Sequence, residues 1–322
     1  VRTARAPRAA PRTASGGGAE WRVRQGLLLS LQRAGGVDGR RRARQGQAQR
    51  SAGRGGKEER GPADTRAAAA AAATAAAAGA PAAAAGGMVS EEDKAAQLHW
   101  MHADECILVD EDDNVTGHAS KLDCHLMSKG LLLHRAFSLF VFNRKHELLL
   151  QQRSASKITF PLVWTNTCCS HPLFKEEQME GSPEDGCVGV RRAAQRKALH
   201  ELGIRPEQLP LEAIVPVARI HYRAPCGDKE NKWGEHEVDY CLFATADVDV
   251  ELNPEEAAAV RSVTQEELRA LVAQADDAAT GITLSPWFRL IQRSLLHGWW
   301  DKLEEGKLGE AVDMDIKRLG FD

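Results

Sequence analysis

The chain has 322 residues and a formal net charge of −3, but this near-neutral total combines two segments of opposite charge. Residues 1–87 contain 16 Lys and Arg against 5 Asp and Glu, whereas residues 88–322 contain 26 against 40. The first segment is mostly Ala, Gly and Arg, which excludes a folded core of its own, and no apolar run in residues 88–322 approaches the roughly 18 residues of a membrane span.

Residues 1–87 are predicted to be a disordered leader. An Arg-rich, acid-poor composition is typical of an organelle transit peptide, although Ser is scarce, and a secretory signal would need a longer apolar core. We expect removal of the leader and a plastid location, with the mitochondrion or the cytoplasm as alternatives. Because no Met precedes Met88, part of the segment is alternatively translated upstream sequence or an incomplete end. A basic nucleic-acid-binding arm ranks third, since Trp21 is the only aromatic residue among the arginines.

Residues 88–322 are predicted to form one compact domain with a substantial core. All seven cysteines of the chain lie in this segment. An odd number of cysteines without a secretory signal predicts free thiols in a reducing compartment. We expect a monomer with no nucleic-acid partner.

The first half of the domain is predicted to contain four strands and one helix. Residues 105–117 have the pattern of a strand, an acidic turn and a second strand, and residues 134–153 that of a β-hairpin. A helix is expected over residues 182–203, because Ser182 precedes Pro and acidic residues as an N-cap and Gly203 is suited to a C-cap.

The second half is predicted to contain strands followed by helices. The first of these helices begins with a capping box formed by Thr264 and Glu267. The expected elements are strands at 211–224 and 236–248 and helices at 264–276 and 285–303. This order predicts an α+β fold in which a mixed sheet lies between helices.

Two pairs of reactive residues are spaced two apart: Cys169 with His171, and Glu235 with Glu237. In an extended segment such residues point to the same side. Two neighbouring carboxylates repel each other, and a cation between them relieves the repulsion. The upstream histidines extend this set to imidazole and carboxylate donors, which suit an octahedral divalent ion better than a thiolate zinc site. The candidate ligands are His125, His134, His171, Glu235 and Glu237.

Other interpretations of these residues remain open from composition alone. Single histidines in strands are usually surface or satisfied residues, and Cys is commonly buried in cores. A structural zinc site is a weaker alternative, because adjacent Cys168 and Cys169 lack the C-x2-C spacing. A Cys/His hydrolase would need a third group to orient the base, and none is evident. The residues by themselves therefore indicate a metal-bearing enzyme with a reactive thiol.

Four motifs resemble those of the type I isopentenyl-diphosphate isomerases, in particular plant and algal members. They are HRAFSLFVFN at 134–143, TNTCCSHPL at 165–173, WGEHEVDY at 233–240 and SPWF at 285–288. The resemblance implies a Nudix-like fold and an enzyme of isoprenoid biosynthesis. Such an enzyme converts isopentenyl diphosphate to dimethylallyl diphosphate by protonation and deprotonation through a tertiary carbocation.

The resemblance also implies roles for individual residues. Cys169 would be the catalytic thiol, Glu237 assisted by Tyr222 the other catalytic group, and Trp287 a wall of the site facing the cation. The five His and Glu residues named above would hold one divalent metal (Mg²⁺, Mn²⁺ or Zn²⁺), and Glu201 would help to bind a second ion, Mg²⁺, on the substrate. The implied partners of the prenyl diphosphate are Lys121, Arg153, Lys157 and Lys197.

One helix departs from the Nudix hydrolase pattern R-E-U-x-E-E-x-G-U, in which U is aliphatic. The chain has RKALHELGI at 196–204, so Lys197 and His200 replace two carboxylates that hold hydrolytic magnesium. We interpret this as a framework that binds a diphosphate without cleaving it. A Nudix-type diphosphate hydrolase remains the alternative function.

Overall fold

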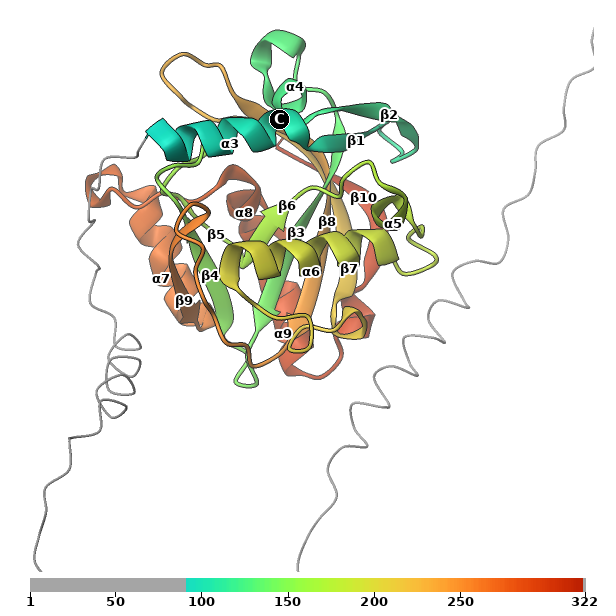
Figure 1. Ribbon diagram of the computed structural model, residues 1–322. Helices are drawn as coiled ribbons and strands as arrows, with labels where there is room; N and C mark the ends of the chain where they lie inside the picture. The colour runs from blue at the N-terminus through green and yellow to red at the C-terminus, as the bar shows by residue number, and fades with distance from the viewer. Residues whose placement is uncertain (1–90, 321–322) are drawn as a thin grey trace, which may run out of the picture. The chain divides into compact units, whose positions relative to one another are not determined.

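The computed structural model describes residues 91–320, so the predicted leader lies outside the described part of the chain (Figure 1). The α-helices are α3 (Glu91–Ala103), α4 (Lys121–His125), α5 (Glu176–Met179), α6 (Val188–Leu202), α7 (Gln265–Asp276), α8 (Pro286–Ile291) and α9 (His297–Glu304). The strands are β1 (Glu105–Val109), β2 (Val115–Ser120), β3 (His134–Phe142), β4 (Leu148–Arg153), β5 (Trp164–Thr165), β6 (Cys168–Ser170), β7 (Val215–Pro225), β8 (Gly234–Thr245), β9 (Ala257–Val263) and β10 (Asp313–Leu319).

The strands form one mixed sheet with the order β10-β7-β8-β3-β1-β2, and β3 also pairs with β4 and β6. β3 runs parallel to β8, whereas β7 and β8 are antiparallel. All nine residues of β3 are buried, because helices cover both faces of the sheet at this point. The predicted α+β fold with a mixed sheet between helices is confirmed.

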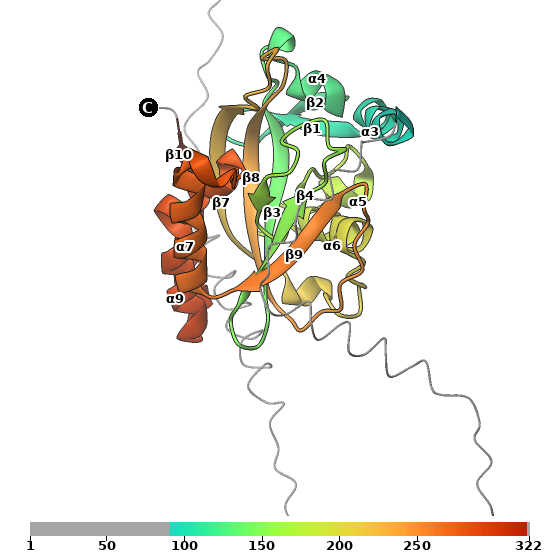
Figure 2. The same ribbon diagram turned by 90° about the vertical axis from the view of Figure 1, so that its left-hand side faces the viewer.

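Alternate residues of β3 pack on opposite faces of the sheet. Phe137 and Leu139 belong to the cluster that includes α6, whereas Phe140 and Phe142 belong to the cluster that includes α7, α8 and α9. Figure 2 shows α6 on one side of the sheet and α7 and α9 on the other. On β8 the same alternation brings Glu235 and Glu237, two residues apart, to the pocket described below.

The predicted start of the central helix is wrong. α6 begins at Val188, and its N-cap is Cys187, whose φ of 54° lies in the left-handed region. Ser182 instead closes a turn, in which its carbonyl accepts a hydrogen bond from the Cys187 N–H at 3.0 Å. The C-cap is confirmed, since Gly203 has a φ of 64° and its N–H bonds back to the last turn.

The other predicted elements are confirmed with local changes. The strands at 134–153 are joined by a turn but pair only at Phe142 and Leu148, because β4 continues along β9. The capping box of Thr264 and Glu267 opens α7. The helix at 285–303 consists of α8 and α9 with a π-helical turn at Gln292–Leu296 between them. Helices α3, α4 and α5 and strands β5, β9 and β10 were not predicted.

Candidate active site

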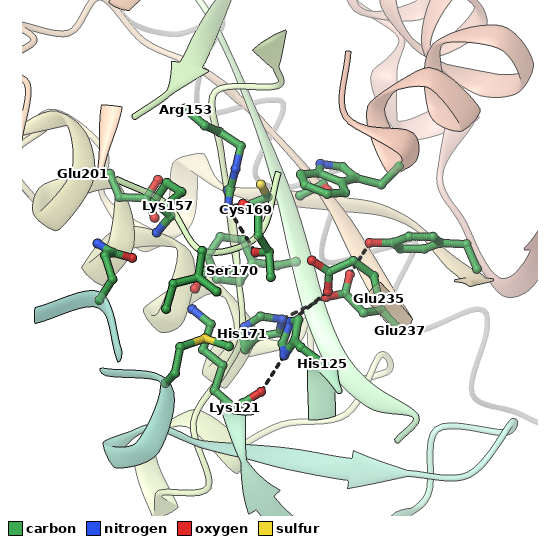
Figure 3. A pocket seen from close by; sticks show the side chains of 18 residues that line it. Lys121, His125, Arg153, Lys157, Cys169, Ser170, His171, Glu201, Glu235 and Glu237 are labelled. Carbon is green, nitrogen blue, oxygen red and sulfur yellow. Dashed lines mark hydrogen bonds and ion pairs between the residues drawn. The ribbon is translucent and has the colours of Figure 1, made fainter. Parts of the chain in front are cut away.

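One pocket brings together nearly all of the residues singled out in the sequence (Figure 3). Its lining includes Cys169, Tyr222 and Trp287 with three of the candidate diphosphate-binding side chains. His134 and Lys197 do not line it, but both are buried and contact side chains that do. The lining residues are Gln97, Met101, Lys121, His125, Phe137, Ser138, Arg153, Lys157, Ile158, Thr159, Cys169, Ser170, His171, Glu201, Tyr222, Glu235, Glu237 and Trp287.

The adjacent cysteines point to opposite faces of the sheet. Cys169 lies opposite Ser138 in the β3–β6 pairing, and both line the pocket. Cys168 instead packs in the cluster on the α6 side, where its thiol donates a hydrogen bond to Glu201 Oε2 at 3.5 Å. The period of two along a strand therefore distinguishes the pocket thiol from its buried neighbour.

Five buried side chains converge on a single point beside the pocket. Their ligand atoms all lie within 4.8 Å of one another. α4 supplies the first residue, β3 and the segment after β6 supply the other two histidines, and β8 supplies both carboxylates; parallel pairing sets His134 directly opposite Glu237. The group consists of His125, His134, His171, Glu235 and Glu237.

The donor atoms of this group fit a divalent cation. His125 Nδ1 lies 2.6 Å from the Lys121 carbonyl oxygen, and His134 Nδ1 lies 2.8 Å from that of Leu132. A carbonyl only accepts, so both Nδ1 atoms carry a proton, and the neutral His125 turns the lone pair of its Nε2 inward. His125 Nε2 thus faces Glu235 Oε2 at 2.8 Å, so either a proton on this carboxyl or a cation must lie between the two atoms.

Without a cation, the two buried carboxyl groups of this set do not both ionise. Burial and the neighbouring charge of Glu237 raise the pKa of Glu235 well above its usual value. Burial lowers the pKa of His125 to about 3, so this imidazole remains neutral. In addition, His134 Nε2 and Glu235 Oε2 have no hydrogen-bond partner among the described residues. A bound divalent ion would satisfy these atoms and let both carboxylates ionise, so the residues fit a metal site.

Glu237 connects this group of five His and Glu side chains, the metal-type group, to the pocket through its two carboxylate oxygens. Oε1 lies 2.8 Å from His171 Nε2 and 3.5 Å from His134 Nε2. Oε2 accepts a hydrogen bond of 2.6 Å from the hydroxyl of Tyr222, which is the residue opposite Glu237 on β7. Burial, with the charge of Glu237, raises the Tyr222 pKa, so the phenol keeps its proton. Glu237 therefore presents Oε1 to the candidate metal ligands and Oε2 to a proton donor, the Tyr222 hydroxyl.

Cys169 is a protonated thiol in the free pocket. Burial raises its pKa to about 12, against the opposing charge of Arg153. By contrast, burial disfavours the charged form of Glu237, but its interactions with His134 and His171 outweigh this effect and keep the pKa of this carboxyl well below its usual value. The free pocket thus holds one proton on sulfur and none on Glu237.

Arg153 and Trp287 form one wall of the pocket. Arg153 donates hydrogen bonds to the carbonyl oxygens of Phe160 at 2.9 Å and Thr159 at 2.8 Å, and its guanidinium lies 5.9 Å from the centre of the Trp287 ring. Trp287 Nε1 donates to Asn166 Oδ1 at 3.1 Å. Arg153 therefore orders the loop beside the indole as well as placing a charge in the pocket.

Charged side chains form a second cluster around the end of α6. Lys197 Nζ lies 3.0 Å from Glu201 Oε1, and Gln151 Nε2 donates to Glu201 Oε2 at 3.2 Å. Lys157 Nζ donates to Glu256 Oε2 at 2.6 Å. Two of the predicted diphosphate-binding lysines, Lys157 and Lys197, are thus already paired with buried carboxylates, and Glu201 lies beside them as a candidate oxygen ligand.

Several pocket and support residues were missed in the sequence. Asn166 is part of a quoted motif, yet nothing in its local pattern indicates that it holds Trp287. Gln97 and Met101 reach the pocket from α3, a helix whose position depends on long-range packing. A Glu after an Asn-Pro turn ordinarily indicates a surface residue, so burial of Glu256 had no local signal.

Comparison with known proteins identifies the family. Residues 132–288 match the model described as NUDIX domain. The chain is 54% identical over 223 residues to "Isopentenyl-diphosphate Delta-isomerase I" of Clarkia breweri, covering 68% of this chain and 76% of that protein. It is 55% identical, with the same coverage, to "Isopentenyl-diphosphate Delta-isomerase II, chloroplastic" of Arabidopsis thaliana. The chain belongs to the isopentenyl-diphosphate Delta-isomerase family.

Membership in the isopentenyl-diphosphate Delta-isomerase family confirms the predicted family and its Nudix-like fold. The names of the relatives describe isomerases, so they do not favour the hydrolase alternative. Several of these relatives, including one from Cannabis sativa that is 53% identical over 223 residues, are named chloroplastic. Among residues 91–320, none of the helices combines the length and apolar character needed to cross a bilayer.

Proposed function

We propose that the chain, an isopentenyl-diphosphate Delta-isomerase by family, isomerises isopentenyl diphosphate to dimethylallyl diphosphate in this pocket. The proposal for the individual residues is supported by one observation above all. The Cys169 thiol on β6 and the Glu237 carboxylate on β8 line the same pocket as Arg153 and Lys157. The pocket therefore combines two proton-transfer groups with cations that complement a diphosphate.

The substrate alkene has no heteroatom to share a positive charge, so its protonation gives a tertiary carbocation. A donor must deliver a proton to one end of the allylic unit while an acceptor removes one from the other end. We assign the donor side to Glu237 with Tyr222, and the acceptor side to Cys169. The hydroxyl of Tyr222 keeps Glu237 Oε2 in place at 2.6 Å while the proton moves.

The proton distribution of the free pocket corresponds to one end of this cycle. With a thiol at Cys169 and an ionised Glu237, the pocket has the arrangement that remains after a forward turnover. The forward reaction starts from the opposite arrangement, with Glu237 protonated and Cys169 a thiolate. Each group donates in one direction and accepts in the other, so the proton must return to Glu237 before the next forward turnover.

The three histidines and two glutamates would hold a divalent metal of the Mg²⁺, Mn²⁺ or Zn²⁺ type. When bound, such an ion supplies positive charge that fixes the Glu237 carboxylate and tunes its proton affinity. The residues of the chain then orient Glu237: His171 lies at Oε1 and Tyr222 at Oε2. A separate Mg²⁺ would accompany the diphosphate near Glu201.

Trp287 is expected to stabilise the carbocation with its indole face, by about 2 kcal/mol once water is excluded. We predict that Trp287→Phe retains a larger kcat than Trp287→Leu, by about tenfold, because Phe keeps a π face and Leu does not. Steady-state rates at saturating substrate measure this difference. Asn166→Ala, which removes the hydrogen bond to Nε1, serves as the control for misplacement of an intact indole. Equal rates for Phe and Leu would remove the electrostatic role of Trp287.

The activity is tested by incubating the full chain with isopentenyl diphosphate and Mg²⁺ and detecting the allylic product by its lability in acid. Release of phosphate from prenyl or nucleoside diphosphates, without this product, would instead support the hydrolase alternative. A metal-chelating treatment followed by addition of single ions identifies the metal that restores turnover.

Residues 1–87 are proposed to be a plastid transit peptide, and residues 88–322 the catalytic domain. The chloroplastic names of several relatives support this location. We predict that removing residues 1–87 leaves kcat and KM unchanged, because the pocket lining lies entirely within residues 97–287. Comparison of both chains in the same assay checks this, and gel filtration checks the expected monomer. A truncated chain without activity would show that the leader contributes to the catalytic domain.

A further inference from the structure

We propose that Glu256 is a positioning residue for diphosphate binding, because its carboxylate holds Lys157 and Lys197 together at the pocket. This inference rests on the proposed function, which assigns the diphosphate to Arg153 and Lys157; the family resemblance adds Lys197. Glu256 itself does not line the pocket and would not touch the reacting atoms. Its effect would be exerted through the two lysines.

Each oxygen of Glu256 faces a different lysine. Oε2 accepts a hydrogen bond from Lys157 Nζ at 2.6 Å, and Oε1 lies 3.9 Å from Lys197 Nζ. Lys197 also contacts Glu201 Oε1 at 3.0 Å. Lys197, Glu201 and Glu256 are buried and the Lys157 side chain is 10% exposed, so these pairs are largely shielded from water and salt. Glu256 is therefore the bridge between a lysine of the loop after β4 and a lysine of α6.

The backbone around Glu256 is fixed to both lysine-bearing segments. The Ser154 N–H donates to the Glu256 carbonyl at 3.0 Å, and the Ser154 hydroxyl donates to the Pro254 carbonyl at 2.7 Å. On the other side, the Asn253 N–H donates to the Glu201 carbonyl at the end of α6 at 3.0 Å. This bonding leaves the Glu256 carboxylate little freedom to follow a lysine that moves.

The charge of Lys157 depends on this carboxylate. Burial lowers the pKa of Lys157 to about 8, and the charge of Glu256 is the largest influence that opposes the decrease. The other charges that act on Lys157 are cations, namely Arg153, Lys121 and Lys197. Without Glu256, Lys157 would lose its proton or turn away from its cationic neighbours.

Glu256 also adds negative charge near the proposed diphosphate site, and its removal would lessen repulsion. We expect the resulting gain in diphosphate affinity to be the smaller effect, because both Glu256 oxygens face lysines that screen them from the pocket. The larger effect is the loss of the charged hydrogen bond between Lys157 and the diphosphate, because these two groups are in direct contact. Removing Glu256 should therefore weaken binding.

The test is a double-mutant cycle on the full chain, with calorimetric titration of inorganic diphosphate in the presence of Mg²⁺. Glu256→Gln is expected to raise the Kd about tenfold, the scale of one charged hydrogen bond. In a Lys157→Met background the same change should add little, because Glu256 acts through that lysine. With isopentenyl diphosphate, KM should rise in parallel while kcat stays within about threefold of the parent.

Two further variants make the result specific. Glu255→Gln changes the adjacent, exposed glutamate and should leave the Kd unaltered. Glu256→Asp keeps the charge but shortens its reach, so it should give an intermediate loss even if Glu256→Gln folds poorly. Additive losses in the cycle, an unchanged Kd or tighter binding by Glu256→Gln would each overturn the inference. The inference would also be overturned if high Mg²⁺ restored the affinity of Glu256→Gln for diphosphate, because this result would identify Glu256 as a magnesium ligand.

The inference and the proposed function fail separately. A parent chain that does not isomerise isopentenyl diphosphate contradicts the function, whereas the cycle with inorganic diphosphate still measures coupling between Glu256 and Lys157. An active parent with no coupling leaves the function intact and removes only the role of Glu256.

Discussion

Replacing Cys169 with Ala should reduce kcat by about 10³-fold or more, because the proposed proton acceptor on one side of the substrate is lost. Cys169→Ser should be nearly as inactive, since a hydroxyl ionises far less readily than a thiol. The Kd for inorganic diphosphate should change little, because the lysine cluster does not involve the sulfur. Turnover and calorimetry on the same preparations separate chemistry from binding.

Cys168→Ala is the matched control for this prediction. Its thiol packs on the α6 side of the sheet and does not line the pocket, although it donates at 3.5 Å to Glu201, which does. We expect a stability loss of about 1 kcal/mol and little change in kcat. A Cys169→Ala chain with full activity, or a Cys168→Ala chain with none while still folded, would contradict the assignment of the pocket thiol.

Local periodicity was enough to predict which neighbouring residues share a face. Cys169 and His171, like Glu235 and Glu237, do line the same pocket, as their spacing of two predicts for extended chain. The meeting of the two pairs depends on the parallel register that places His134 opposite Glu237. No local pattern encodes a register between residues so far apart, so the sequence grouped these residues by their donor chemistry and by the family resemblance, not by their pairing.

The errors in the sequence analysis have comparable physical causes. Ser182 has good N-cap chemistry, but the chain enters the left-handed region at Cys187 and the helix begins only afterwards. β4 follows β3 through a turn and then leaves it for β9, a partner more than 100 residues later in the chain. In each case tertiary contacts override a sound local preference.

The second large effect is expected at Glu237, and a comparison with Glu235 separates its two proposed roles. Both carboxylates belong to the metal-type group, but only Glu237 accepts a hydrogen bond from Tyr222. Replacing either Glu with Gln removes an anionic ligand, so both variants should hold less metal per chain when analysed by mass spectrometry. Each variant is therefore assayed over a range of metal concentrations up to saturation.

At saturating metal, Glu235→Gln should recover much of its activity, since its carboxylate has no proposed part in proton transfer. Glu237→Gln should remain about 10³- to 10⁴-fold slower, because an amide neither donates nor accepts the transferred proton. The amide is nearly isosteric and can still accept from Tyr222, so the loss would reflect chemistry rather than packing. If both variants recover equally, Glu237 is only a metal ligand, and the donor side of the reaction must be sought elsewhere in the pocket.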